Sequence, residues 1–364
     1  KTGKRKFIPS AQVMSTNIAF PNQEVTRGSV DSFTNGTVKK LKPKDVKFQV
    51  ETPNFMHGVA TNLVPMIESS QGNRLGMGAK YSTQALSLKD REVPLVQSKD
   101  DTVTSREQSM ETTIGVATLP KSEEDGVVTK VDKDFIHVKG TSGKSHRIPY
   151  ATNFPMASKT MMHHEVRVKK GDKIKRNQAL ADSNFTKDGT LALGKNLKVG
   201  YMAYQGLNSN DAVVVSRSAA NKMTSVEVVK KVIPLDKDTK IDTKKHFANF
   251  PKEFNKDQYG RLKDGVITPG AKIKKGDPIA TVLRKAEPSI ENKMFGKIHK
   301  SLRRSYSDDS LVWDKDVEGE ILDVERGNKQ ITVTIKSENA SKVGDKVANR
   351  YGGKGVISKI IEDD

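Results

Sequence analysis

The stretch Lys342–Gly355, which reads KVGDKVANRYGGKG, joins a Gly-Asp pair to a lysine and then to a basic, glycine-rich loop. Glycine permits positive φ and lets the backbone approach a ligand closely. Lys346 and Lys354 place compact positive charges at the two ends of this loop. The pattern predicts phosphate binding, whereas for any single lysine a solvated surface charge is the alternative.

Two other segments repeat the Gly-Asp pattern, VKKGDKI at residues 168–174 and IKKGDPI at residues 273–279. Each predicts a strand, a tight turn and a second strand. Short runs of Val, Ile and Thr begin near residue 112. An earlier stretch, Thr52–Ser69, has apolar residues at helical spacing and Thr52 as a candidate N-cap. The sequence therefore predicts a β-rich α+β fold with small β-barrels.

The composition favours a polyanionic partner. The chain has 63 Lys and Arg against 44 Asp and Glu, a formal net charge of +19. Such an excess supports electrostatically driven binding, and a generally basic, solvated surface is the alternative. Aromatic residues make up only 5%, so phosphate contacts are expected to outweigh base stacking. Cysteine is absent, which excludes disulfides, Cys-ligated zinc and thiolate catalysis. No apolar run reaches the roughly 20 residues of a membrane span, and we expect a cytoplasmic chain.

Two further segments make the loop motif specific. Asn73–Gly78 reads NRLGMG, and a GKN triplet at residues 194–196 leads into GLNSNDAVVVS at residues 206–216. In this order the segments resemble the catalytic half of the β subunit of multi-subunit DNA-dependent RNA polymerases, in patches from about residue 45 to residue 364. The resemblance implies that Asn73–Gly78 forms a turn, and that Arg74 in this turn contacts the triphosphate of the incoming nucleotide. The planar fork of arginine suits that task, since it donates two hydrogen bonds to phosphate oxygens.

The resemblance also assigns residues near the reacting phosphates. Asp211 matches the second carboxylate of the family's acidic pair, while Asn210 replaces the first and cannot act as an anion. Lys346 and Lys354 match the lysines of the family's Gly-Asp-Lys motif, with Arg350 between them. The resemblance implies that Lys346 is catalytic and that Lys354, Arg350 and Asn210 bind the nucleotide. For the upstream lysine the best match is Lys336, and Lys342 is the alternative.

The family's architecture implies the domain arrangement. A double-psi β-barrel is expected from residues 115–223 and 316–364, because Asp211 and Lys346 must converge. A flap-like module is expected at 224–315, after a mixed α/β segment at 1–114. The flap's short helix is expected to dock a promoter-specificity factor through its apolar side chains: Met294, Phe295, Ile298 and Leu302. Packing against its own domain is the alternative for that helix.

The sequence contains no run of clustered aspartates to hold the two metals of nucleotidyl transfer. The resemblance implies that a large β′-like partner subunit supplies the Mg²⁺ site, so that the chain is inactive alone. The partners that it implies are the remaining β fragments, template DNA, nascent RNA and nucleoside triphosphates. It further implies that the chain is part of a split β subunit of a large bacteriophage polymerase. A non-catalytic nucleic-acid-binding β-barrel protein and a carrier-type domain are the alternatives.

Overall fold

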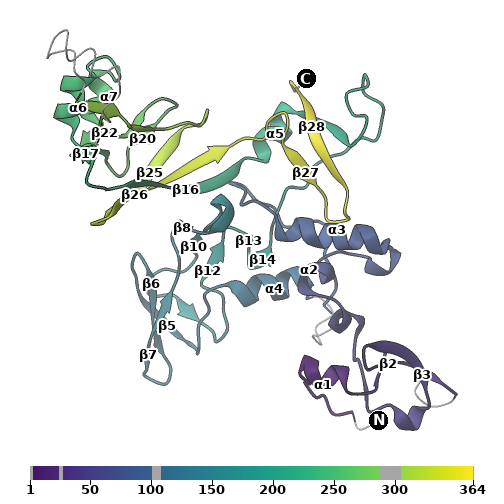
Figure 1. Ribbon diagram of the computed structural model, residues 1–364. Helices are drawn as coiled ribbons and strands as arrows, with labels where there is room; N and C mark the ends of the chain where they lie inside the picture. The colour runs from purple at the N-terminus through teal and green to yellow at the C-terminus, as the bar shows by residue number, and fades with distance from the viewer. Residues whose placement is uncertain (1–2, 24–27, 101–107, 287–304, 364) are drawn as a thin grey trace. The chain divides into compact units, whose positions relative to one another are not determined.

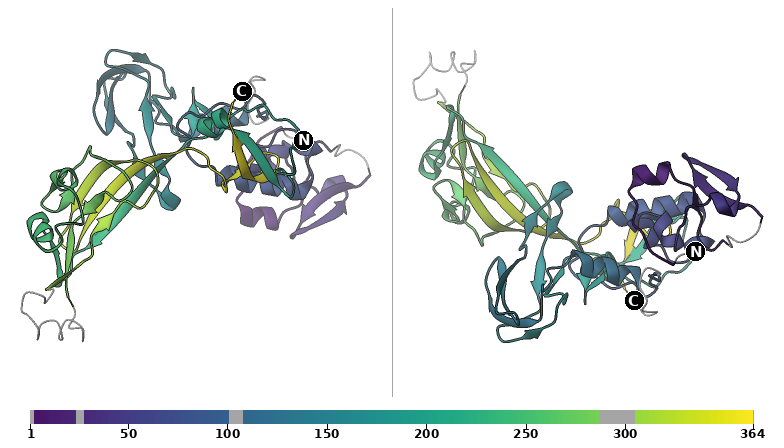
Figure 2. Two further views of the ribbon diagram at one scale, coloured as in Figure 1. Left: turned by 90° about the horizontal axis from the view of Figure 1, so that it is seen from above. Right: turned by 90° about the horizontal axis from the view of Figure 1, so that it is seen from below.

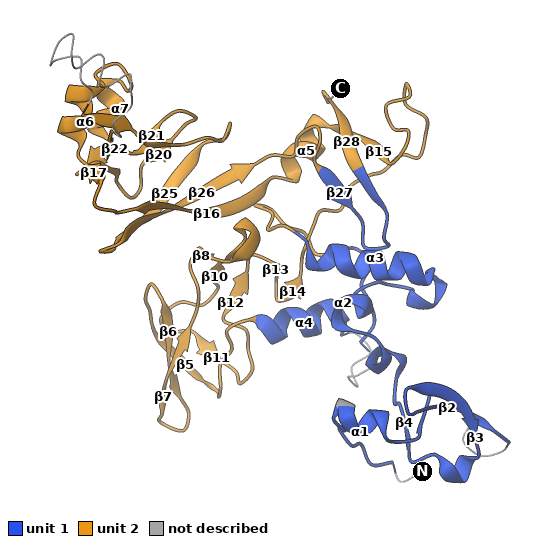
Figure 3. Cartoon of the chain, viewed as in Figure 1, with its two compact units in different colours: residues 1–85, 94–118, 346–355 blue, residues 86–93, 119–345, 356–364 orange. Residues whose placement is uncertain are grey.

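The computed structural model describes residues 3–23, 28–100, 108–286 and 305–363. The described chain is a β-rich α+β protein, which confirms the predicted fold class (Figure 1). It divides into two compact units (Figure 3). Unit 1 comprises Lys1–Ala85, Pro94–Thr118 and Lys346–Gly355, and unit 2 comprises Leu86–Val93, Leu119–Asp345 and Val356–Asp364. No helix within the described residues is long and apolar enough to cross a membrane.

Unit 1 contains a small sheet and several helices. The sheet has the order β3-β2-β1-β4, with β1 antiparallel to β2 and parallel to β4. The strands are β1 (Ile18–Ala19), β2 (Val30–Thr34), β3 (Thr37–Leu41), β4 (Phe48–Gln49) and β27 (Lys346–Ala348). The α-helices are α1 (Ser10–Met14), α2 (Val59–Asn62), α3 (Gly72–Thr83) and α4 (Met110–Thr118). Short 3-10 helices cover Pro43–Asp45, Pro53–Met56 and Ile67–Ser69.

The predicted continuous helix over Thr52–Ser69 is wrong. The structure breaks it into the 3-10 turn Pro53–Met56, helix α2 and the 3-10 turn Ile67–Ser69, and Thr52 makes no side-chain cap. Gly58 and Pro65 explain the breaks, since glycine weakens a helix interior and proline removes a backbone donor.

The regular secondary structure of unit 2 consists mainly of strands. Its helices are short: α5 (Arg217–Lys222), α6 (Thr243–Asn249), α7 (Lys256–Gly260) and the 3-10 turn Ala157–Lys159. The strands of its first part are β5 (Gly126–Val131), β6 (Phe135–Gly140), β7 (Ser145–Pro149), β8 (Phe154–Pro155), β9 (Met161–Met162), β10 (His164–Val166), β11 (Lys173–Ile174), β12 (Ala181–Ser183), β13 (Thr186–Lys187), β14 (Thr190–Leu191) and β15 (Ala212–Ser216). The later strands are β16 (Ser225–Pro234), β17 (Thr239–Ile241), β18 (Leu262–Lys263), β19 (Val266–Ile267), β20 (Lys272–Ile273), β21 (Pro278–Ala280), β22 (Val282–Lys285), β23 (Tyr306–Asp308), β24 (Leu311–Val312), β25 (Gly319–Arg326), β26 (Gln330–Asn339) and β28 (Lys354–Ile361), which continues from unit 1.

The main core of unit 2 lies on the sheet β16-β26-β25-β20. Strands β25 and β26 are antiparallel and run side by side in both views of Figure 2. Trp313 is fully buried here among Ile273, Ile321 and Ile335. Its indole nitrogen donates to the carbonyl of Val317 at 2.6 Å, so the buried polar atom is satisfied. This core includes residues before and after position 315, where the flap-like module is predicted to end and the barrel to resume. The division into these two modules stays a prediction.

The three Gly-Asp segments form the predicted turns and share one hydrogen-bond pattern. In each turn the glycine has positive φ, and the aspartate carboxylate accepts from the amide of the lysine three residues earlier. These pairs are Asp172 with Lys169 at 2.7 Å, Asp277 with Lys274 at 2.9 Å and Asp345 with Lys342 at 2.9 Å. Such Asx-type bonds stabilise a tight turn.

Each of these turns also forms two backbone hydrogen bonds with one residue from another part of the same chain. The turn glycine donates to that residue's carbonyl, and that residue's amide donates to the aspartate carbonyl. The residues held in this way are Val128, Trp313 and Ile357. Two turns that the sequence pattern missed have the same backbone bonds, with Asn177-Gln178 and Gly270-Ala271 in place of Gly-Asp. The turn is therefore a repeated means of docking one hairpin onto another strand.

Candidate functional site

The third Gly-Asp turn is bound to β28. It directly precedes the loop Lys346–Lys354, which joins β27 to β28 and is called the lysine hairpin below. The amide of Gly344 donates to the carbonyl of Ile357 at 2.8 Å, and the amide of Ile357 donates to the carbonyl of Asp345 at 2.9 Å. Lys346 follows Asp345 directly and begins β27. Two backbone hydrogen bonds therefore fix the chain immediately before Lys346.

Asp211 is bound by the residue of β28 that precedes Ile357. The amide of Val356 donates to its carbonyl at 2.9 Å, and β15 runs parallel to β28 with Ala212 opposite Val356. Successive amides of a strand point to opposite edges. The backbone of β28 therefore holds Asp211 at one edge and Asp345, the residue before Lys346, at the other.

The turn that presents Asp211 has an unusual backbone. Asn210 and Asp211 have φ values of 51° and 62°, in the left-handed region, and both side chains are exposed. Asn and Asp tolerate this conformation better than other non-glycine residues, but it still costs on the order of 1–3 kcal/mol each. Strain of this kind is typical of functional turns.

Arg74 lies on helix α3 in unit 1. The resemblance implied a turn over Asn73–Gly78, and this expectation is wrong, since the helix runs without a break from Gly72 to Thr83. The Nη1 atom of Arg74 donates to the carbonyl of Gly352 at 3.1 Å. The structure thus brings Arg74 to the loop between Lys346 and Lys354.

Two glycines allow helix α3 and this loop to touch. A Cβ atom added to Gly78 would lie 2.1 Å from the carbonyl oxygen of Arg350. A Cβ atom added to Gly352 would lie 2.2 Å from the carbonyl oxygen of Arg74. Real Cβ atoms do not approach backbone this closely, so each glycine is required for the contact.

Asn349 organises the loop between Lys346 and Lys354 through its side-chain oxygen. Its Oδ1 atom accepts from the amides of Tyr351 at 3.0 Å and Gly353 at 2.9 Å. Its own amide donates to the carbonyl of Gly353 at 2.9 Å. An asparagine shortly before a Gly-Gly pair is a turn signal that would have identified it.

Both terminal nitrogens of the Arg350 guanidinium donate hydrogen bonds to protein groups. Nη1 donates to Glu111 Oε1 at 2.8 Å and to the carbonyl of Leu63 at 3.2 Å, and Nη2 donates to the carbonyl of Val96. The Glu111 side chain is 2% exposed. The structure therefore gives Arg350 a buried partner that the sequence did not reveal.

The cationic side chains named from the sequence have different surroundings. Lys346 and Lys354 are exposed, and neither ammonium group has a side-chain partner among the described residues. Lys336 is half-buried on β26, opposite Val228 and Glu320. Burial lowers the pKa of His163, and the nearby Lys336 charge lowers it further. Lys346 and Lys354 are thus free to neutralise a bound phosphate.

Lys195 of the GKN triplet is paired with two acidic side chains rather than free. The Lys195 side chain is 2% exposed and its Nζ atom lies 2.7 Å from Asp90 and 2.8 Å from Glu92. The hydrogen bond from Lys195, with those from Asn196, lowers the pKa of Glu92 to about 2. The charge of Lys195 is therefore already paired, and its two ion pairs link residues 90–92 to residues 194–196.

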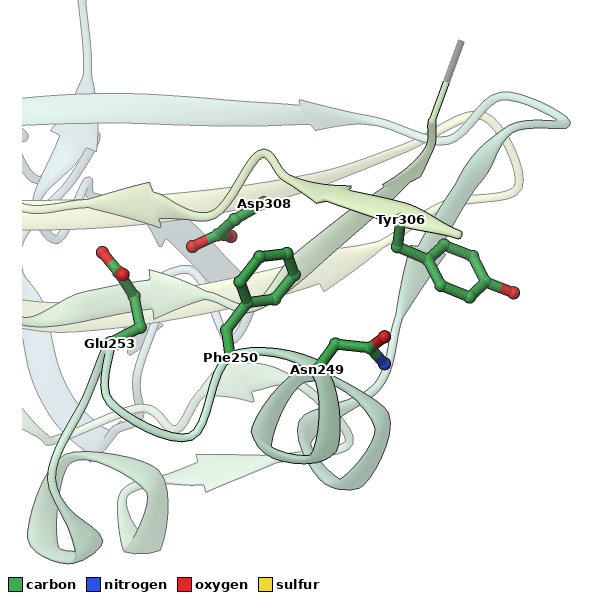
Figure 4. A pocket seen from close by; sticks show the side chains of 5 residues that line it. All are labelled: Asn249, Phe250, Glu253, Tyr306 and Asp308. Atoms are coloured by element: carbon green, nitrogen blue, oxygen red, sulfur yellow. The ribbon is translucent and has the colours of Figure 1, made fainter. Parts of the chain in front are cut away.

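The flap helix residues Met294, Phe295, Ile298 and Leu302 lie outside the described residues. Within the described part of the flap-like range, a cavity of about 510 Å³ is lined by Asn249, Phe250, Glu253, Tyr306 and Asp308 (Figure 4). Two carboxylates in its lining disfavour a polyanion. Phosphate binding is therefore better served by the lysine hairpin.

No group of three or more His, Cys, Asp or Glu side chains in the described ranges is arranged to hold a metal ion. His163 and His164 instead accept backbone amides through Nδ1, from Asn153 at 3.2 Å and from Ala151 at 3.0 Å. Burial lowers the pKa of both imidazoles.

Comparison with known proteins agrees with the sequence resemblance. The family model for RNA polymerase Rpb2, domain 6, matches residues 121–364. The DNA-directed RNA polymerase subunit beta of Prochlorococcus marinus (strain MIT 9312) is 30% identical over 342 residues, which cover 89% of this chain and 30% of that protein. The same subunit of Rubrobacter xylanophilus is 28% identical over 346 residues, covering 90% and 30% respectively.

The chain thus spans about 30% of the length of the curated relatives it matches. The family match covers both strands that hold the candidate site in unit 2, β15 and β28, and the whole Lys346–Lys354 loop. The chain belongs to the RNA polymerase Rpb2, domain 6, family.

Proposed function

We propose that this chain supplies part of the active centre of a DNA-dependent RNA polymerase and contributes basic side chains to template-directed nucleotidyl transfer. The observation that carries the proposal is the hairpin with free Lys346 and Lys354, whose loop is held against Arg74. Phosphoryl transfer is catalysed largely by positioning and by fixed positive charge where negative charge develops. An exposed pair of lysines on an anchored loop suits this role.

Each residue has a proposed task. Lys346 and Lys336 neutralise charge at the reacting phosphate, while Lys354 and Arg74 bind nucleotide phosphates. Asp211 orients the nucleotide or its water, and Asn210 assists by hydrogen bonding alone. We assign Arg350 to holding the loop, because its guanidinium is already bound by protein groups.

The remaining expectations form part of the same proposal. A double-psi β-barrel combines residues 115–223 and 316–364, and the parallel pairing of β15 with β28 supports it. Mg²⁺ would be held mainly by a large β′-like partner subunit, as the resemblance implies. The other proposed partners are the remaining β fragments, template DNA, nascent RNA, nucleoside triphosphates and a specificity factor at the flap helix. The split-subunit form and the bacteriophage origin stay predictions.

Affinity purification of the tagged chain from cells that produce it tests this proposal. We expect a large subunit with clustered aspartates to co-purify, and the complex to extend RNA on a preassembled RNA–DNA scaffold. A chain that purifies alone, and binds the scaffold without any synthesis, would instead identify a nucleic-acid-binding β-barrel protein. The net charge of +19 is compatible with both outcomes, so synthesis decides between them.

A further inference from the structure

Glu111 is a buried carboxylate in unit 1 for which the local sequence gave no reason. It lies in the first turn of α4, where the helix dipole favours a negative charge. Its Oε1 and Oε2 atoms accept from the amide of Ser98 at 3.1 and 2.9 Å. Oε1 also accepts from Arg350 Nη1 at 2.8 Å.

Arg350 lies midway in the loop, four residues from Lys346 and four from Lys354. Its guanidinium is bound by Glu111 and by the carbonyls of Leu63 and Val96. The planar fork of arginine fixes both distance and orientation when both of its terminal nitrogens are engaged, as they are here. The loop between the two lysines is therefore clamped at its centre by three other segments of unit 1.

We infer that Glu111 is a positioning residue: through Arg350 it fixes the loop that carries Lys346 and Lys354. This inference rests on the proposed function. A buried ion pair has a large desolvation cost and is often replaceable by apolar residues without loss of stability. An apolar pair, however, does not form the directed hydrogen bonds that Arg350 donates to the Leu63 and Val96 carbonyls. The pair thus sets the place of the loop rather than adding to stability.

The test uses variants of the assembled polymerase on a preassembled RNA–DNA scaffold. Glu111→Gln keeps the side-chain volume and an acceptor for the Ser98 amide, but removes the carboxylate charge that pairs with the partly exposed Arg350 guanidinium. We expect the rate of single-nucleotide addition to fall about 10- to 100-fold. Glu111→Asp keeps the charge and is expected to recover part of the rate. Glu68→Gln, an exposed glutamate of the same unit, is the matched control and is expected to leave the rate unchanged.

A double variant, Glu111→Gln with Arg350→Met, separates positioning from stability. Removing both charges leaves no unpaired ion, so thermal stability and assembly are expected to recover. The addition rate is expected to remain low, because the hydrogen bonds to the two carbonyls are lost. Recovery of both stability and rate would overturn the inference, and so would a normal rate in Glu111→Gln.

Lys346→Ala in the same preparation keeps the two claims apart. If it is inactive while the double variant has a normal rate, only the positioning inference fails. If Lys346→Ala itself synthesises RNA normally, the proposed function fails as well.

Discussion

Replacing Lys346 with alanine is expected to reduce nucleotide addition by the assembled polymerase at least about 100-fold while leaving assembly intact. Lys346 is exposed, so its removal leaves no buried group unpaired and the fold is unaffected. In a closed active centre, however, loss of one preorganised charge costs on the order of 3 kcal/mol of transition-state stabilisation. Single-turnover extension of RNA on a scaffold measures this effect directly.

Lys359→Ala is the matched control for this experiment. Lys359 is also an exposed lysine and lies on β28, to which the Gly344-Asp345 turn before Lys346 is anchored. Its removal is expected to leave the rate within about two-fold, since a single surface charge contributes little. An assembled Lys346→Ala enzyme that elongates at the normal rate would refute the assignment of Lys346.

Gly78→Ala is expected to impair synthesis nearly as strongly, although alanine is the better helix former. Its Cβ atom would lie 2.1 Å from the Arg350 carbonyl oxygen, so helix α3 and the loop must move apart. That movement breaks the hydrogen bond from Arg74 to Gly352. We expect a loss of about 1–3 kcal/mol in stability from overpacking and a rate reduced at least about 10-fold.

Gly76→Ala provides a control two residues away on the same helix. A Cβ atom there would meet nothing within 4 Å. Alanine is therefore expected to stabilise the helix by about 0.5–1 kcal/mol and to leave the rate unchanged. Equal effects of the two substitutions on melting temperature and rate would contradict the close contact between α3 and the loop.

The parts of the fold that could be predicted from the sequence are those with local causes. Gly171, Gly276 and Gly344 precede an aspartate, and glycine with Asp is a direct signal for a tight turn. The equivalent turn at Asn177-Gln178 has the same backbone hydrogen bonds. It lacks the Gly-Asp pair, so the sequence pattern does not reveal it. Over Thr52–Ser69 the apolar spacing alone predicts one helix, whereas Gly58 and Pro65 interrupt it in the structure.

The candidate site was only partly predictable for a related reason. Lys346, Lys354, Arg74 and Asp211 stand in recognisable motifs, whereas Glu111 meets Arg350 across 239 positions of sequence. A pair so distant leaves no periodicity or spacing that a single sequence can show. The same holds for the contact between Gly78 and the Arg350 carbonyl, which requires the folded unit to be seen.

The central claim is that the Lys346–Lys354 hairpin faces the reacting phosphates, and chemical labelling tests it most directly. A nucleotide with an aldehyde on its terminal phosphate forms an imine with a nearby lysine amine, which borohydride then reduces to a stable bond. In the assembled enzyme, after peptide mapping, we predict that the label lies on Lys346 or Lys354 and is displaced by the natural nucleotide. Labelling spread over surface lysines, and unaffected by the natural nucleotide, would contradict the account.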